Sequence, residues 1–378
     1  MPDEKLITSR GGKALRRGWT TGSCAAAASQ AAAVLLLSGI APPEIHLHTP
    51  GGITFRLPVE NAHRSGSAAV CTVRKDAGDD PDITNGVRIT ASVRRIEKGV
   101  AIEGGAGVGR ITRPGLAMPV GEAAINPGPR QQITDAVHRA AEQNGYDGGF
   151  SVTISVEDGE ALAAQTYNGH LGIVGGISIL GTSGIVEPMS EKALVDTIRL
   201  ELDSLYAQGQ RIAFLCPGNY GADFARDTLG LDLERAVKCS NFIGEAFDHA
   251  AYRGYPEILL VGHAGKLVKM AASVMNTHSS VADARQEIFT AHAALCGAPR
   301  EILEGLMTAI SVDACVELLD EVNLRQPVLS RIGREMETRI ALRMKGQACV
   351  EFIMFTGKYG VLAESAGARA LCERLKLQ

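Results

Sequence analysis

The feature that most constrains the fold is a strand that breaks into small residues and then leads into a helix. It lies in residues 172–190, GIVGGISILGTSGIVEPMS, where the apolar segment Ile177–Leu180 runs into Gly181-Thr182-Ser183-Gly184 ahead of an expected helix. Such a break exposes backbone N–H groups at a helix N-terminus, where the helix dipole favours an anion. In open α/β sheets, ligands bind outside the carboxyl ends of the strands. The sequence therefore predicts that Gly181–Gly184 line a cofactor crevice.

The same alternation of strand, small-residue loop and helix continues to the C-terminus. Further strands are expected at 211–215, 236–239, 257–261 and 350–355, with helices around 190–208, 221–229, 241–253 and 266–276 and a longer helical region at 281–346. Apolar strands joined by crossover helices predict a parallel sheet covered on both faces. The loops after the strands, at 217–221, 240–241, 262–266 and 356–360, would meet at one edge of that sheet. We therefore expect a C-terminal Rossmann-like parallel α/β domain over residues 166–378.

The preceding residues 1–165 follow a different pattern. Four segments, 45–50, 53–60, 68–76 and 86–96, alternate apolar and polar residues, as half-buried strands do. An alanine-rich helix is expected between Thr20 and Gly39, another helix over Ile133–Asn144, and a strand over Phe150–Val156. Together these elements predict an N-terminal α+β domain with a mixed or antiparallel sheet, so that the whole chain is a two-domain α/β protein.

Two arginines precede the alanine-rich helix. Arg16 and Arg17 lie next to the turn Thr21-Gly22-Ser23, where the helix would begin. Guanidinium groups beside a free helix N-terminus are suited to carboxylates or phosphate. The alanines themselves are also explained by a core helix with an ordinary cap, so the anion-site hypothesis concerns the arginines and the turn.

Four aspartates lie within the segment Lys75–Gly86, KDAGDDPDITNG. Their oxygens suit a hard cation, but the spacing does not match an EF-hand, and a solvated turn is the more ordinary explanation. A glycine run at 103–113, EGGAGVGRITR, is not followed by a helical pattern, so it fails as a dinucleotide-binding fingerprint and predicts a flexible loop carrying Arg110 and Arg113. His278 has two open interpretations, a structural hydrogen-bonding residue or a functional one.

Composition narrows the classes of partner and compartment. A net charge of -4 and only 4% aromatic residues argue against nucleic acid and against an acidic membrane surface. The eight cysteines form no CxxC pair and the histidines no HExxH motif, so a protein-bound metal is not expected. The N-terminal residues lack the apolar core of a signal peptide, and the apolar run Ala31–Leu37 is too short to span a bilayer. We expect a cytoplasmic protein, with homodimerisation as a default assumption.

Taken together, nine stretches resemble the cobalt-precorrin-5B C1-methyltransferase family of anaerobic cobalamin biosynthesis. They are LRRGWTTGSCAAAA (15–28), DAGDDPDITNG (76–86), EGGAGVGRIT (103–112), AINPGPR (124–130), GIVGGISILGTSGIVEPMS (172–190), CPGNYG (216–221), SNFIGEA (240–246), LLVGHAGKLVKMAA (259–272) and NTHSSVADAR (276–285). The resemblance implies methyl transfer from S-adenosylmethionine to ring carbon C1 of cobalt-precorrin-5B, giving cobalt-precorrin-6A. It also implies that the cobalt belongs to the multiply carboxylated corrinoid substrate.

On this interpretation residues 1–165 would bind the corrinoid and residues 166–378 would bind S-adenosylmethionine. The expected cofactor residues are Gly181, Thr182, Ser183, Gly184, Gly218, Asn219, Tyr220, Gly221, Asn241, Gly262 and Lys266. Glu187 or Glu245 would hold the ribose hydroxyls, although a plain helix-surface charge explains each equally well. The candidates for the substrate's carboxylate arms are Arg16, Arg17, Thr21, Ser23, Lys75, Arg88, Arg110 and Arg130. If a base removes a ring proton after methylation, Asp82 and His263 are the candidates.

Two alternatives belong to other functional classes. A non-catalytic protein that binds and hands over the corrinoid precursor would need the same anion-binding loops. A nucleotide-dependent kinase using the glycine run at 104–109 is disfavoured, because no phosphate-binding loop with a lysine followed by serine or threonine is present.

Overall fold

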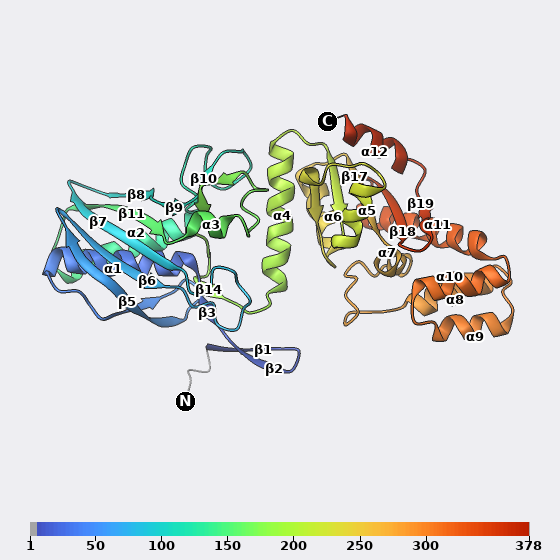
Figure 1. Ribbon diagram of the computed structural model, residues 1–378, viewed down its shortest axis with the longest axis horizontal. Helices are drawn as coiled ribbons and strands as arrows, with labels where there is room; N and C mark the ends of the chain where they lie inside the picture. The colour runs from blue at the N-terminus through green and yellow to red at the C-terminus, as the bar shows by residue number, and fades with distance from the viewer. Residues whose placement is uncertain (1–5, 378) are drawn as a thin grey trace. The chain divides into compact units, whose positions relative to one another are not determined.

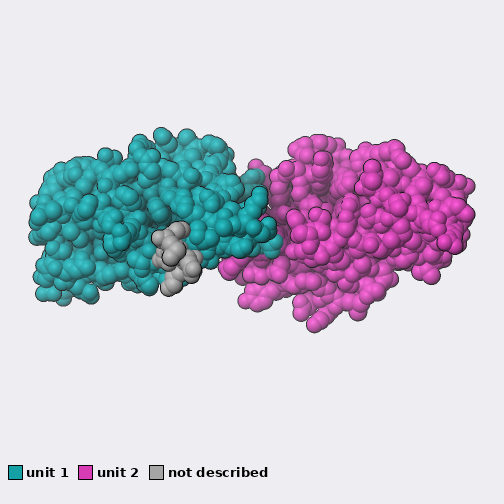
Figure 2. Space-filling view, turned by 90° about the horizontal axis from the view of Figure 1, so that it is seen from below, with its two compact units in different colours: residues 1–191 teal, residues 192–378 magenta. Residues whose placement is uncertain are grey.

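The chain divides into two compact units, residues 1–191 and residues 192–378 (Figure 2), and the computed structural model describes residues 6–377. The sequence predicted the boundary after residue 165, so the structure moves residues 166–191 into the first unit. The reason is local bonding: the backbone N–H of Gly22 donates to the Leu180 carbonyl and that of Thr20 to the Gly184 carbonyl. The predicted cofactor loop therefore belongs to unit 1.

Unit 1 is built on a six-stranded mixed sheet in the order β4-β5-β6-β7-β11-β8. These strands are β4 (Glu44–His48), β5 (Thr54–Ser65), β6 (Ala68–Arg74), β7 (Arg88–Ile96), β11 (Gly149–Val156) and β8 (Val100–Gly104). All neighbours are antiparallel except β11 and β8, which are parallel. The four predicted strands and the strand at 150–156 are confirmed. Strand β8, which leads into the glycine run, was not predicted.

Helices α1 (Thr21–Ser38) and α2 (Pro127–Gln143) pack on each other, and α1 also contacts the four strands β4–β7 (Figure 1). Thr20 caps the start of α1, and Gly39 ends it in the left-handed conformation with φ 78°. Residues Cys24–Ala33 lie in the core of unit 1. Among residues 6–377, one helix is long and apolar enough to cross a bilayer, and that helix is α1. Most of it is buried inside unit 1, which identifies it as a core helix.

Short elements complete unit 1. They are β1 (Ile7–Arg10), β2 (Lys13–Arg16), β3 (Gly18–Trp19), β9 (Gly107–Val108), β10 (Arg110–Ile111), α3 (Gly159–Ala163), β12 (Ile173–Val174), β13 (Gly176–Ile177) and β14 (Ile185–Val186). Strand β13 pairs with β9, β12 with β10, and β14 with β3. The predicted strand Ile177–Leu180 of a parallel sheet is therefore wrong. The glycine run, predicted as a flexible loop, is instead held by these short pairings.

Unit 2 contains a five-stranded sheet in the order β16-β15-β17-β18-β19. Its strands are β16 (Ala236–Lys238), β15 (Ile212–Cys216), β17 (Glu257–His263), β18 (Cys349–Thr356) and β19 (Gly360–Glu364). The first four are parallel, as predicted, and β19 is an antiparallel edge strand that the sequence analysis missed.

Helices cover both faces of this sheet. They are α4 (Glu191–Ala207), α5 (Asn219–Asp227), η2 (Leu233–Arg235), α6 (Ile243–Arg253), α7 (Ala264–Leu267), η3 (Val268–Ala272), α8 (Arg285–Leu295), α9 (Arg300–Thr308), α10 (Val312–Glu321), α11 (Arg325–Met344) and α12 (Ala368–Lys376). Alternate residues of each strand enter opposite cores: Leu215 and Leu260 pack with Phe247 on one side, whereas Phe214 and Leu259 pack with Leu371 on the other. The predicted helical region at 281–346 is confirmed as four helices, α8–α11.

Candidate functional site

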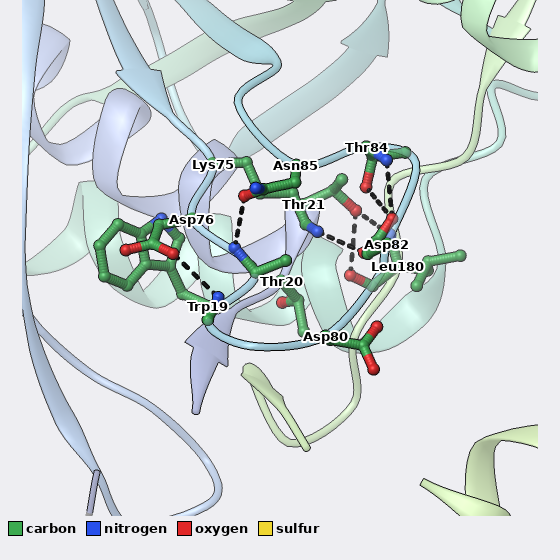
Figure 3. Close-up of polar contacts among 12 residues, drawn as sticks. Trp19, Thr20, Thr21, Lys75, Asp76, Asp80, Asp82, Thr84, Asn85 and Leu180 are labelled. Carbon is green, nitrogen blue, oxygen red and sulfur yellow. Dashed lines mark hydrogen bonds and ion pairs between the residues drawn. The ribbon is translucent and has the colours of Figure 1, made fainter. Parts of the chain in front are cut away.

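In unit 1, one surface loop joins two distant parts of the chain. This aspartate loop, residues 75–86, lies against the segment before α1 (Figure 3). The Trp19 amide donates to the Asp76 carbonyl at 2.9 Å, and the Asp79 amide donates to the Arg16 carbonyl at 2.9 Å. Gly78 has φ +69°, and a Cβ there would lie 2.1 Å from the Arg16 carbonyl oxygen. Only glycine fits this close approach of two backbones.

Each aspartate of the loop already has a partner. Asp76 accepts two hydrogen bonds from the Arg16 guanidinium, at 2.7 and 2.8 Å, and these hold the pKa of Asp76 below its usual value. Asp79 accepts from the Arg16 amide at 2.6 Å, and Asp80 accepts from the Met189 amide at 2.9 Å. Across residues 6–377, no group of three His, Cys, Asp or Glu side chains is placed to hold a metal. The loop joins the segment before α1 to the rest of unit 1, and its exposed residues, among them Asp79, Pro81 and Ile83, fit the solvated turn expected from the sequence.

Asp82 forms an ion pair with Lys75, which is the most buried charged group of this region. The side chain of Lys75 is 2% exposed and that of Asp82 is 26% exposed. Asp82 also accepts hydrogen bonds from the Thr84 amide and hydroxyl, both at 2.7 Å. Burial alone would raise the pKa of Asp82, but the Lys75 ammonium and the Thr84 bonds outweigh it, so the pKa is lowered. The same contacts make this carboxylate a weaker base than an ordinary aspartate.

The N-terminus of α1 is not free, which contradicts the expected anion site at the turn. Thr20 Oγ1 accepts from the Ser23 amide at 3.2 Å, and the Leu180 carbonyl accepts from the Gly22 amide at 3.0 Å. The Thr21 hydroxyl donates to the Leu180 carbonyl at 3.2 Å and accepts from the Leu180 amide at 2.9 Å. The Ser23 hydroxyl donates to the Gly184 carbonyl at 2.8 Å. These side chains bind the chain's own backbone.

The predicted substrate cations are all engaged in unit 1, to different extents. Arg17 pairs with Glu187 at 2.7 Å, and Arg88 bonds Glu60 and Glu157, each at 3.0 Å. Arg130 donates to the carbonyls of Ile125 and Ile102 at 3.0 and 3.1 Å. Arg110 is exposed, donates to the Gly121 carbonyl at 3.1 Å and lies 3.7 Å from Glu103. Of these predicted cations, Arg110 has the loosest partners.

In unit 2, the sheet order places a topological switch point, where we expect the ligand crevice, between β15 and β17. The connection that leaves β15 runs to β16 on one side, whereas the connection that leaves β17 runs to β18 on the other, so the two diverge at the carboxyl ends of β15 and β17. Such a topological switch point is where open α/β sheets bind ligands. The first turn of α5 packs closely on β17 here, since a Cβ on Gly221 would lie 2.7 Å from the Val261 carbonyl oxygen.

Several predicted cofactor residues meet at this crevice. Lys266 Nζ donates to the Ser240 carbonyl at 3.2 Å and lies 3.4 Å from where a Gly218 Cβ would be. Lys238 Nζ donates to the side-chain oxygen of Asn219 at 3.3 Å. Tyr220 is 78% exposed and its ring centroid lies 6.0 Å from that of His263. The loops after β15, β16 and β17 thus converge, as predicted.

His263 caps α7 with its own ring. Its Nδ1 accepts from the Gly265 amide at 3.1 Å, so a neutral ring carries its proton on Nε2. Burial lowers the pKa of His263, the nearby Arg285 lowers it further, and Asp313 opposes them. The ring is therefore a neutral donor through Nε2–H. Protonation at Nδ1 would break the hydrogen bond from the Gly265 amide that caps α7.

The structure separates the rest of the predicted cofactor set. Five of its residues belong to unit 1, whereas the loops of the parallel sheet belong to unit 2; the five are Gly181, Thr182, Ser183, Gly184 and Glu187. The candidate bases are divided in the same way, with Asp82 in unit 1 and His263 in unit 2.

Other residues of unit 2 have local partners. Glu245 pairs with Arg199 at 2.8 Å, and the Asn241 carbonyl accepts from the Thr277 amide at 2.9 Å. His278 hydrogen-bonds Ser280 within its own turn, at 2.6 Å, which supports the structural interpretation. Two groups escaped the sequence analysis: Glu201, whose pKa burial raises to about 7, and Asp313 on α10. No local motif marks either residue, because the groups close to them, such as Lys238 for Glu201 and His263 for Asp313, are distant in sequence.

Comparison with known proteins gives a consistent result. The family model CbiD matches residues 8–188, and the model for the CbiD C-terminal domain matches residues 276–366. A protein named cobalt-precorrin-5B C(1)-methyltransferase from Ruminiclostridium cellulolyticum is 50% identical over 92% of this chain and 90% of its own length. A protein of the same name from Alkaliphilus metalliredigens is 42% identical over 97% of this chain and 96% of its own length.

A solved structure is also similar. The crystal structure of the cobalamin biosynthesis protein CbiD from Archaeoglobus fulgidus is 30% identical, with a TM-score of 0.41, over 75% of this chain and 88% of that chain.

Proposed function

This chain belongs to the CbiD family, and on that premise we propose that it transfers a methyl group from S-adenosylmethionine to C1 of cobalt-precorrin-5B in the biosynthesis of cobalamin. The relatives that carry this name match it over most of its length. They favour an enzyme over a protein that only hands on the corrinoid. We further propose that unit 2 binds S-adenosylmethionine and unit 1 binds the corrinoid.

The observation that carries the cofactor assignment is the topological switch between β15 and β17. The residues there fit the ligand: Gly218 leaves the backbone accessible, Gly221 lets α5 pack closely on β17, Lys266 supplies a cation for a carboxylate, and Tyr220 offers an exposed ring for a purine. The proposed cofactor set therefore contracts to Gly218, Asn219, Tyr220, Gly221, Asn241, Gly262 and Lys266. Glu245 stays a prediction for the ribose hydroxyls, while Gly181–Gly184 and Glu187 are better explained as structural.

S-adenosylmethionine supplies an electrophilic methyl group, and the chain's own residues need only bind, orient and exclude water. Correct placement of two reactants contributes ~7–11 kcal/mol to such a reaction. A covalent intermediate is not required, so a nucleophile is not required either. The cobalt belongs to the substrate.

In unit 1 we propose that Arg110, with the loosest partners of the predicted cations, contacts a carboxylate arm of the corrinoid. The other predicted cations would hold the shape of that surface through their present hydrogen bonds and ion pairs. They are Arg16, Arg17, Lys75, Arg88 and Arg130. Thr21 and Ser23 would do the same through the backbone of the segment around Leu180.

His263 would serve as a hydrogen-bond donor to a ligand, and a base role for His263 or Asp82 stays untested. A cytoplasmic location and a homodimer stay predictions.

The experiment is a calorimetric titration of the full-length protein with S-adenosylhomocysteine. Tyr220→Ala is expected to weaken binding about 10-fold, since stacking of one base on an aromatic ring is worth ~1–3 kcal/mol. Tyr252→Ala is the matched control: Tyr252 is 83% exposed and lies on the last turn of α6, which leads to the opposite edge of the sheet where β17 begins.

Equal binding by both variants and the unmodified protein would refute the cofactor position. Absence of binding by the unmodified protein, with and without the corrinoid, would favour the handover protein instead.

A further inference from the structure

The connection between β17 and β18 brings a cluster of charges to the carboxyl end of β17. Lys269, on η3, is 3% exposed and donates to the carbonyls of Thr277 and Ala282 at 3.2 and 2.8 Å. Its ammonium lies 3.8 Å from Asp283, which accepts two hydrogen bonds from Arg285, at 2.5 and 2.8 Å. The charges of these three side chains are therefore balanced by ion pairs and hydrogen bonds within the cluster.

Two buried oxygens beside this cluster have no hydrogen-bond partner among residues 6–377. They are Oγ1 of Thr277, whose residue is 3% exposed, and Oδ1 of Asp313, whose residue is partly exposed. An unsatisfied buried carboxylate oxygen is costly, and in folded proteins it usually indicates a missing water, ion or ligand. Asp313 is the stronger indicator, because a carboxylate loses more than a hydroxyl when it gives up its hydration.

Asp313 lies near the proposed cofactor crevice. It occupies the first turn of α10, a helix whose Glu317 forms an ion pair with Lys358 in the loop after β18. Asp313 and Arg285 both influence the ring of His263, at the end of β17. The first turn of α10 is thus close to the loops that follow β17 and β18.

The charge of Asp313 selects one part of the ligand. S-adenosylmethionine has two cationic groups, the sulfonium and the α-ammonium. The sulfonium loses its charge as the methyl group leaves, so a carboxylate beside it would stabilise the reactant more than the transition state and slow the reaction. The α-ammonium keeps its charge throughout. An ammonium also donates three hydrogen bonds, which suits an unsatisfied carboxylate oxygen.

We propose that Asp313 binds the α-ammonium of the methionine moiety of S-adenosylmethionine. This inference rests on the proposed cofactor site, because Asp313 gains a ligand only if the cofactor binds beside β17. It makes Asp313 a residue that distinguishes an amino-acid-bearing cofactor from a bare adenosine thioether.

The test compares two ligands on the full-length protein. S-adenosylhomocysteine carries the α-ammonium, and 5′-methylthioadenosine lacks the whole amino-acid part. Asp313→Asn is expected to weaken S-adenosylhomocysteine about 10- to 100-fold, the usual effect of removing a charged hydrogen bond, and to leave 5′-methylthioadenosine unchanged. The matched control is Glu321→Gln, an exposed carboxylate on the same helix, which should alter neither affinity.

A second measurement needs no variant. N-acetyl-S-adenosylhomocysteine, in which the ammonium is an amide, should bind the unmodified protein as weakly as S-adenosylhomocysteine binds Asp313→Asn. Ligand-free Asp313→Asn should unfold at about the same temperature as the unmodified protein, because the substitution keeps the size of the side chain and Oδ1 of Asp313 has no hydrogen-bond partner to lose.

An unchanged affinity of Asp313→Asn for S-adenosylhomocysteine, or an equal loss for both ligands, would overturn the role of Asp313 while leaving the cofactor site intact. Full-affinity binding of the acetylated ligand would overturn it as well. Failure of the unmodified protein to bind either adenosine ligand would instead overturn the cofactor site, and the inference with it.

Discussion

Replacement of Asp82 by asparagine separates a structural from a catalytic role for the aspartate loop. Lys75 is 2% exposed, and its ammonium faces Asp82. Asp82→Asn leaves this ammonium buried without a counter-charge, and breaking one side of a buried ion pair costs ~3–5 kcal/mol. Because Asp82 is itself 26% exposed and water can partly solvate the cation, we expect a loss near the lower limit, about 3 kcal/mol.

The natural probe of this loss is Trp19, the single tryptophan of the chain. Its indole N–H donates to the Arg74 carbonyl at 3.1 Å, next to Lys75, so its fluorescence reports on unit 1. Urea unfolding followed at Trp19 should show the loss in Asp82→Asn. Asp80→Asn is the matched control, because an asparagine oxygen can still accept from the Met189 amide. In a Lys75→Met background the cost of Asp82→Asn should largely disappear.

The same variant has a defined pH dependence. The folded protein lowers the pKa of Asp82 below its ordinary value of 3.8, so the pair's contribution is complete above about pH 5. It is lost as the pH falls through the folded pKa. The stability difference between the unmodified protein and Asp82→Asn should therefore shrink below pH 4. Loss of methyl transfer in Asp82→Asn with an unchanged urea midpoint would refute the structural interpretation.

Three further predictions concern other positions. Gly78→Ala should destabilise unit 1 by about 3 kcal/mol in the same urea assay, whereas Gly66→Ala, with a similar φ of +60° and open space, should cost only about 1 kcal/mol. Burial raises the pKa of Glu201 to about 7 and so penalises its ionised form. Glu201→Gln should therefore stabilise unit 2 by about 2–3 kcal/mol above pH 7, and this gain should vanish toward pH 4. Thermal unfolding followed by circular dichroism at several pH values measures the difference. Arg110→Ala should raise the KM for the corrinoid about 10-fold at an unchanged melting temperature. Arg130→Ala should instead lower the melting temperature, because it loses the contacts of Arg130 with backbone carbonyls. An unchanged KM in Arg110→Ala would show that Arg110 does not contact the substrate.

The sequence was most informative where local pattern and tertiary role coincide. Three of the four parallel strands of unit 2, namely β15, β17 and β18, are nearly continuous apolar runs, as strands buried on both faces must be. The meeting of the loops after β15, β16 and β17 follows from that topology. The alternating strands of unit 1 were predictable for the same reason, since one face of each is buried against α1.

Failures came from partners that are distant in sequence. The segment around Ile179 looks like a strand of the parallel sheet, but its amide donates to the Ala124 carbonyl and its carbonyl accepts from the Asn126 amide, in unit 1. Arg16 and Arg17 look like free cations, yet each has a carboxylate partner at least 60 positions away. Periodicity and composition contain no information on which remote carbonyl or carboxylate will be close, so they could neither place this segment in unit 1 nor foresee the ion pairs of the two arginines.

The most direct test of the account is single-turnover methyl transfer by the full-length protein. Cobalt-precorrin-5B would be mixed with S-adenosylmethionine bearing a ¹³C-labelled methyl group, and the product analysed by nuclear magnetic resonance. We expect one labelled methyl group at C1, formed more slowly by Tyr220→Ala at subsaturating S-adenosylmethionine and at the normal rate by Tyr252→Ala. Transfer to C1 at the normal rate by Tyr220→Ala would contradict the cofactor site in unit 2. Absence of any labelled product from the unmodified protein would contradict the proposed reaction itself.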